Sequence, residues 1–138
     1  MPLLQLSLTN VPLTDHQRTD VLAGLTARMA SILGKRADLT VVNVTQSDSA
    51  HWSLGGQSLE GRGWCASLVV HVTAGTNTAE EQAAFIESAF TMLKEVLAAP
   101  PSAPVYIIVN EIAAHSWGYD GRTQLSRRAP APAATPTA

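Results

Sequence analysis

Apolar and polar positions alternate along short stretches of the chain, and between these stretches the apolar positions recur at helical spacing. Residues 4–8 alternate as in a strand with one buried face. From Thr14 to Gly34 the apolar residues recur three and four positions apart, which predicts an amphipathic helix opened by a capping box of Thr14 and Gln17. Residues 39–45 are rich in β-branched side chains and predict a second strand. Together these elements predict a β-α-β unit.

The same order of elements returns about 64 residues later, so the chain carries an internal repeat. Residues 67–73 predict a strand, and a second helix begins at a capping box of Thr78 and Glu81. Residues 105–109 predict the most apolar strand of the chain. We therefore expect a second β-α-β unit that copies the first.

Each half ends in a predicted hairpin, in which an aromatic residue precedes a glycine turn: Trp52 in the first half and Trp117 in the second. The final ten residues contain only Ala, Pro and Thr, a composition that buries no core and predicts a flexible tail. The expected organisation is one domain with two units and a tail: residues 1–128, with the units at about 1–63 and 64–128, and residues 129–138.

A helix between two strands places those strands parallel through a right-handed crossover. We therefore expect an α/β fold (α+β in some schemes), in which two tandem β-α-β units form a four-stranded sheet with two helices on one face. The other face then needs a cover, and association with further copies of the chain supplies one. A closed ring of subunits, a homotrimer, is the expected assembly.

Composition narrows the possible partners. The 138 residues are 46% hydrophobic and 14% charged, with a formal net charge of −2, which gives no reason to expect nucleic acid or a membrane as a partner. Cys65 is the single cysteine and has no second cysteine to pair with, and no Cys/His cluster suggests a metal. With neither a signal-peptide pattern nor an apolar run of membrane-spanning length, the sequence predicts a cytoplasmic protein.

A family resemblance follows from several features together. The start Met1-Pro2, the alternating strand that follows it, the β-α-β unit and the glycine hairpin with its aromatic residue resemble the 4-oxalocrotonate tautomerase family. Two fused copies resemble its double-length members, including the malonate semialdehyde decarboxylase, cis-chloroacrylic acid dehalogenase and macrophage migration inhibitory factor groups. The resemblance covers nearly the whole chain apart from the tail. It implies a trimeric enzyme that uses no cofactor and whose N-terminal proline is the catalytic base.

The chemistry of Pro2 is compatible with this role. A small second residue allows removal of Met1, which leaves a secondary amine at the chain terminus. Burial or a neighbouring cation lowers the pKa of such an amine toward neutrality. A base of that strength moves a proton between the carbon and the oxygen of an enol. The alternative is that Pro2 only begins an edge strand. The counterpart of Pro2 in the second unit is Ala66, so one such site is expected per chain.

The sequence departs from the family pattern at the arginines that hold substrate carboxylates. Where the family has an arginine before the first helix, this chain has the neighbourhood of Leu13 instead. Where the family has arginines on the strands after the helices, the nearest positions here are Val41 and Tyr106. The paired arginines of the decarboxylases and dehalogenases would fall near Thr76. Without bidentate arginines the usual dicarboxylate substrate is in doubt, and so are the decarboxylase and dehalogenase activities.

Two residues besides Pro2 are candidates for catalysis. Arg122 lies in the stretch Gly-Arg-Thr-Gln, which resembles one that follows the last hairpin of the decarboxylase group; a solvated surface arginine is the alternative. Tyr106 occupies a strand position that faces the pocket in the family, where its hydroxyl would polarise a carbonyl or enolate oxygen; core packing is the alternative. The candidate substrate-binding residues are Trp117, Trp52, Asn110 and Asp38. For the tryptophans the alternative is interface packing, and for Asp38 a turn.

The favoured function is therefore cofactor-independent keto–enol tautomerisation of a small 2-oxo acid, with Pro2 as the general base. One alternative is a Pro2-dependent decarboxylase or hydratase/dehalogenase, which needs a protonated, cationic Pro2 rather than a neutral one. The other is a trimeric binding protein whose pocket is vestigial. A retained Met1 favours the last, because it turns the nitrogen of Pro2 into an amide.

Overall fold

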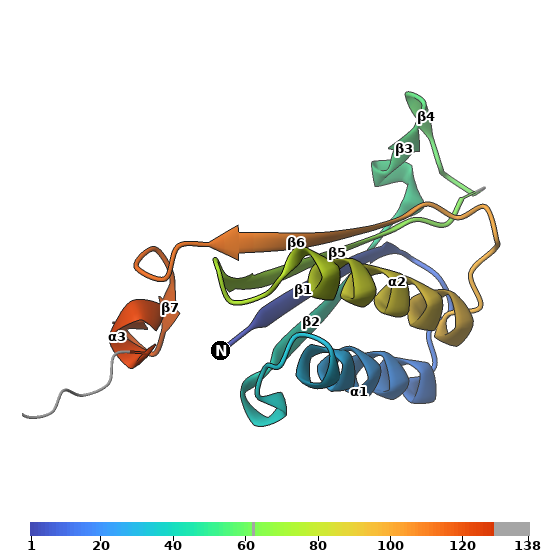
Figure 1. Ribbon diagram of the computed structural model, residues 1–138. Helices are drawn as coiled ribbons and strands as arrows, with labels where there is room; N and C mark the ends of the chain where they lie inside the picture. Colours follow the sequence, from blue (N-terminus) through green and yellow to red (C-terminus); the bar gives the residue numbers. More distant parts are fainter. Residues whose placement is uncertain (62, 129–138) are drawn as a thin grey trace, which may run out of the picture.

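Two β-α-β units follow one another along the chain in the computed structural model, which describes residues 1–61 and 63–128 (Figure 1). The first unit contains β1 (Leu3–Thr9), α1 (Asp15–Ser31), η1 (Ala37–Leu39), β2 (Val41–Ser47), η2 (Ser49–His51), β3 (Ser53–Leu54) and β4 (Gln57–Ser58). The second contains β5 (Ala66–Thr73), α2 (Ala79–Val96), β6 (Val105–Ile112), β7 (Gly118–Tyr119), β8 (Arg122–Thr123) and α3 (Gln124–Arg128). The tail predicted at residues 129–138 lies outside the described residues.

The four long strands form one sheet in the order β2-β1-β5-β6. β1 pairs in parallel with β2 and β5 in parallel with β6, whereas β1 and β5, which join the two units, run antiparallel. In that central pair Gln5 lies opposite Val69. Val69 follows Gln5 by 64 residues, the period of the repeat, so it is the residue of the second unit that corresponds to Gln5. The register therefore relates the two units by an approximate two-fold axis, and it sets the start of β1 beside the end of β5.

Both long helices begin as their sequences predict. The Thr14 hydroxyl accepts a hydrogen bond from the backbone N–H of Gln17 at 3.0 Å, and the Gln17 side chain accepts one from the backbone N–H of Thr14. Thr78 and Glu81 make the same reciprocal pair at the start of α2. Each box satisfies two backbone donors that the first turn of a helix leaves unpaired.

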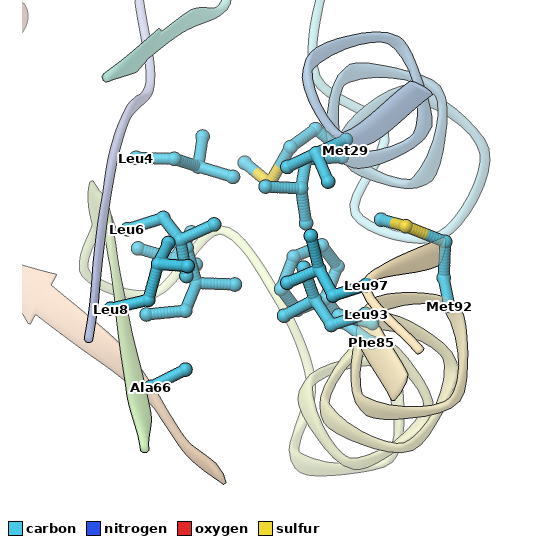
Figure 2. Packing of buried hydrophobic residues seen from close by; sticks show 14 of the residues in the cluster. Leu4, Leu6, Leu8, Met29, Ala66, Phe85, Met92, Leu93 and Leu97 are labelled. Atoms are coloured by element: carbon cyan, nitrogen blue, oxygen red, sulfur yellow. The ribbon is translucent and has the colours of Figure 1, made fainter. Parts of the chain in front are cut away.

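The core lies between the sheet and the two helices, which cover the same face (Figure 1). Strand residues at every second position supply one side of it, because their side chains point alternately to the two faces. Figure 2 shows these residues opposite the helix residues that pack on them. Among the fully buried side chains are Leu4, Leu6, Leu8, Leu25, Met29, Leu68, Val70, Phe85 and Leu93. The expected α/β fold, with two helices on one face of a four-stranded sheet, is confirmed.

Among residues 1–61 and 63–128, no element covers the opposite face of the sheet. Tyr106 and Ile108 on β6 are 67% and 45% exposed, although the apolar sequence of that strand is typical of one buried on both sides. A polar row crosses the middle of this face. The imidazole of His71 lies 2.7 Å from the side-chain oxygen of Gln5 through Nε2 and 3.1 Å from the side-chain nitrogen of Asn110 through Nδ1. Apolar and polar groups thus alternate on the open face.

The two hairpins lie at opposite ends of the sheet. The β3–β4 hairpin rises at one end, and the β7–β8 hairpin with α3 lies at the other, on the side where the chain begins (Figure 1). Within the described residues, no helix combines the length and the apolar character needed to cross a membrane.

Candidate functional site

Pro2 is buried at the start of β1, where the backbone holds it in place. Its carbonyl oxygen accepts a hydrogen bond from the backbone N–H of Val41 at 3.1 Å, which ties it to the neighbouring strand β2. Met1 precedes it, so the nitrogen of Pro2 is an amide in this form of the chain. The hydrogen bond to β2 therefore fixes Pro2 through its carbonyl group.

A small cavity of about 80 Å³ lies beside Pro2. Its walls come from the start of β1, the end of α1, the end of β5 and the β7–β8 segment: Met1, Pro2, Lys35, Val72, Thr73, Thr76 and Trp117. The antiparallel pairing of β1 with β5 produces this arrangement, because it sets the end of β5 directly beside the beginning of the chain.

Lys35 enters the cavity from the loop after α1. Gly34 has φ +68°, a conformation that glycine adopts without strain, and the backbone N–H of Lys35 then bonds back to the carbonyl of Met29. The Lys35 ammonium donates to the hydroxyl of Thr76 at 2.8 Å. Partial burial lowers the pKa of Lys35, and the nearby carboxylate of Glu81 opposes that shift. Lys35 therefore brings a partly desolvated cation to the cavity of Pro2.

Trp117, which lies just before β7, also lines the cavity beside Pro2. Its indole Nε1 donates to the hydroxyl of Thr73 at the end of β5 at 3.2 Å, which fixes the plane of the ring. The same side chain also lines a wider cavity of about 330 Å³ on the hairpin, together with Arg122. Trp117 thus borders both spaces.

A second cavity of about 240 Å³ adjoins the first and shares Met1, Thr73 and Thr76 with it. The new walls come mainly from α3 and include Gln124 and Arg127. Because both cavities are lined by Met1, the first residue of the chain lies between them.

Arg127 is held by the hairpin that precedes α3. Its guanidinium carbon lies 3.9 Å from the centre of the Tyr119 ring, and one terminal nitrogen donates to the Tyr119 carbonyl at 3.0 Å. Within the described residues, the Nε of Arg127 is shielded from solvent and has no hydrogen-bond partner. A shielded N–H donor is costly to leave unpaired, so this guanidinium is suited to an anion bound in the cavity.

The amine at the chain terminus responds to this environment. Burial lowers the pKa of the Met1 amine, and the positive charges of Lys35 and Arg127 lower it further. The amine donates to the side-chain oxygen of Gln124 at 3.4 Å. An amine at this end of the chain is therefore a stronger candidate for a neutral base than an exposed one.

Of the residues that the sequence singles out, Pro2 and Trp117 lie together and the others lie apart. Arg122 lines the hairpin cavity and donates to the carbonyl of Ser126 at 3.4 Å. Tyr106 and Asn110 lie on the open face of the sheet, where Asn110 contacts His71.

Of the last two predicted residues, Trp52 lies on a loop and Asp38 in the short helix η1. Trp52 precedes the other hairpin, at the far end of the sheet, and donates to the hydroxyl of Ser47 at 2.8 Å. Asp38 forms an exposed ion pair with Arg36 at 2.6 Å. Within one chain, neither residue lines the cavities next to Pro2.

Sequence reasoning missed Lys35, Gln124 and Arg127 as members of this site. Two signals were present: Lys35 follows the glycine that ends a helix, and Gln124 and Arg127 are three residues apart, on one side of a helical turn. Neither signal places these side chains beside Pro2 without knowledge of how the strands pair. As for metals, the described residues contain no group of three or more His, Cys, Asp or Glu side chains that could hold an ion.

Comparison with known proteins identifies related chains. No family model matches the sequence. A protein called probable tautomerase K2, from Dickeya dadantii (strain 3937), is 31% identical over 62 residues, which span 45% of this chain and 92% of that protein.

Solved structures share the fold. A wild-type fused 4-OT (4-oxalocrotonate tautomerase) described as a symmetric trimer has a TM-score of 0.81 and 18% identity, with 92% of this chain and 99% of that one covered. A native fused 4-OT has a TM-score of 0.79 and 24% identity, with 90% and 97% covered. A macrophage migration inhibitory factor-like protein from Entamoeba histolytica has a TM-score of 0.70 and 16% identity, with 88% and 97% covered.

Proposed function

The chain belongs to the tautomerase superfamily, and we propose that it catalyses keto–enol tautomerisation of a small 2-oxo acid with the amine of Pro2 as general base. Removal of Met1 releases this amine. The observation that carries the proposal is the position of Pro2, which is buried beside a cavity lined by Lys35 and Trp117, with a second cavity lined by Arg127 next to it. No cofactor enters the reaction.

The proton transfer needs only one group that alternates between base and acid. The neutral Pro2 nitrogen takes the proton from the C2 hydroxyl of the enol and returns it to C3, which leaves the ketone. Its rigid ring fixes the direction of the lone pair, and the hydrogen bond from Val41 to the Pro2 carbonyl fixes the residue itself. A base whose pKa lies near the working pH performs both transfers efficiently.

The surrounding cations favour a neutral base over a cationic acid. Lys35 and Arg127 lower the pKa of the Met1 amine, and the same charges would act on the Pro2 amine after Met1 is removed. This argues for tautomerisation rather than for decarboxylation or water addition, which require the protonated amine. The two cations also take the place of the family arginines as partners for a substrate carboxylate, and Arg127 offers an N–H that has no partner among the described residues.

We further propose that the protein is a homotrimer assembled through the open face of its sheet. The exposed Tyr106 and Ile108 on that face support this, as does the description of a similar structure as a symmetric trimer. In such an assembly Tyr106, Trp52 and Asp38 would contribute to a Pro2 site only from a neighbouring subunit. Arg122 stays a prediction for catalysis, and Asn110 stays one for substrate binding.

The test combines the intact mass of the purified protein with ketonisation of phenylenolpyruvate by the native protein and by Pro2→Ala. We expect a mass that lacks Met1 and a loss of about 10²-fold or more in kcat/KM for Pro2→Ala, because the ring and the secondary amine are both removed. Pro12→Ala, a change at an exposed proline at the opposite end of β1, is the matched control and should retain native activity.

Two results would contradict the proposal. A retained Met1 blocks the nitrogen of Pro2 and leaves the binding-protein alternative. Native activity in Pro2→Ala shows that another group moves the proton.

A further inference from the structure

Gln124 is the first residue of α3, and its side-chain amide forms hydrogen bonds with Met1. Its backbone N–H bonds to the carbonyl of Trp117 at 2.8 Å, which anchors the residue to the hairpin. Its Oε1 accepts from the Met1 amine at 3.4 Å, and its Nε2 donates to the Met1 carbonyl at 3.3 Å. The orientation of the amide follows from its partners, because the amine donates and the carbonyl accepts.

The Met1 carbonyl marks the place of a substrate oxygen. The Met1 carbonyl carbon is bonded to the nitrogen of Pro2, so it occupies the side of that nitrogen that opens once Met1 has been removed, between the positions of the lone pair and the N–H. A substrate carbon that exchanges a proton with this nitrogen approaches from the same side. The oxygen on that carbon or on its neighbour then lies close to the position of the Met1 oxygen, within reach of Nε2 of Gln124.

On this basis, and resting on the proposed function, we propose that Gln124 binds the substrate and donates a hydrogen bond to its C2 oxygen. During the reaction the proton moves from the C2 hydroxyl to the Pro2 nitrogen and then to C3, while Gln124 stabilises the negative charge that develops on the oxygen and exchanges no proton. Gln124 and Arg127 are three residues apart on α3 and line the same cavity. An amide beside a guanidinium matches a 2-oxo acid, in which the C2 oxygen adjoins the C1 carboxylate.

The first test measures phenylenolpyruvate ketonisation by Gln124→Leu and Gln124→Glu. Leu removes the donor at similar size, and Glu puts a negative charge where the enolate oxygen develops. We expect kcat/KM to fall by about 10²-fold in Gln124→Leu and further in Gln124→Glu, mostly through kcat. Gln57→Leu, at an exposed glutamine of the other hairpin, is the matched control and should behave as native.

A second measurement separates binding from an effect on the fold. Phenylpyruvate and 3-phenylpropanoate differ only in the C2 oxygen, so the ratio of their inhibition constants reports recognition of that oxygen. We expect the native protein to prefer phenylpyruvate and Gln124→Leu to lose this preference. A structural role for Gln124 would weaken both inhibitors alike and leave the ratio unchanged.

The outcomes also distinguish this inference from the proposed function. If Pro2→Ala is inactive but either Gln124 variant stays within about threefold of native kcat/KM, or the inhibitor ratio is unchanged in Gln124→Leu, the role of Gln124 is overturned and the function of Pro2 stands. If Pro2→Ala retains native activity, it is instead the proposed role of Pro2 as the general base that fails.

Discussion

The terminal amine shows how single residues tune the candidate site. The amine is part-buried, and two cations from distant parts of the sequence, Lys35 and Arg127, act on it. Desolvation and like charge both disfavour the protonated amine, so both lower its pKa. A general base works in its neutral form, and a lowered pKa therefore extends activity toward lower pH.

With Met1 removed, as proposed, Lys35 and Arg127 should act on the Pro2 amine as they act on the Met1 amine, and removing either charge should reverse the effect. In Lys35→Gln or Arg127→Gln the protonated amine is penalised less, its pKa rises, and the acidic limb of kcat/KM moves to higher pH. The measurement is the pH profile of phenylenolpyruvate ketonisation. Lys35→Arg retains the charge and serves as the control, with its acidic limb near the native position. An acidic limb that stays in place in both Gln variants would show that these charges do not act on the catalytic base.

At the scale of elements, the two capping boxes give a natural comparison. Gln17 closes the box of α1 and carries no charge, whereas Glu81 closes that of α2 and titrates. Hydrogen bonds lower the pKa of Glu81, the largest effect coming from the backbone N–H of Thr78 and the next from the side chain of Asn77. The carboxylate is therefore favoured by the folded state. Its contribution to stability is present above the pKa of an unfolded Glu and is lost as the pH falls through the folded pKa.

Glu81→Gln should keep the capping box and remove this pH dependence. We expect the free energy of unfolding to fall less steeply on acidification from neutral pH to about pH 3 than it does in the native protein. Denaturant titrations across that range measure the difference. Equal slopes in native protein and Glu81→Gln would mean that the cap of α2 gains nothing from the charge.

At the scale of the whole molecule, the open face of the sheet is the surface through which we propose that the chain assembles. Tyr106 and Ile108 are exposed there, and Val41 on β2 is also exposed. The polar row of Gln5, His71 and Asn110 crosses the same face with its side chains bonded to one another. Polar groups already paired within one chain cost less to bury than free ones, so the face is suited to association.

A charge on this face should prevent the proposed trimer. Ile108→Glu places a carboxylate among apolar contacts, and we expect monomers by light scattering or sedimentation with the secondary structure unchanged. Phe90→Glu, on an exposed position of α2 away from the sheet, is the control and should leave the trimer intact. A trimer that persists in Ile108→Glu would place the interface elsewhere, and a native monomer would remove the assembly altogether.

Local patterns were sufficient to predict the long strands and helices and the architecture, but not the short helices η1, η2 and α3. Thr14 and Thr78 open helices where the sequence places them, and the strand predicted at residues 67–73 is found as Ala66–Thr73. These features depend on side chains a few positions apart: a cap needs its own first turn, and a half-buried strand needs only alternation. The strand predicted at residues 105–109 runs on to Ile112, because backbone pairing with β5 extends it past the apolar stretch.

The make-up of the candidate site was decided by tertiary structure. Pro2 could be predicted as a site residue because it follows Met1, and Trp117 because it lies in a predicted hairpin. Lys35, Gln124 and Arg127 carry no local signal of their partnership with Pro2, and they lie up to 125 residues away along the chain. The antiparallel pairing of β1 with β5 brings the start of β1 and the end of β5, with the segments next to them, to the same end of the sheet. The sequence by itself thus determined which long elements form and singled out Pro2 as the predicted base. Only the packing of those elements determined which charges surround it, because electrostatic effects depend on distance in space and not along the chain.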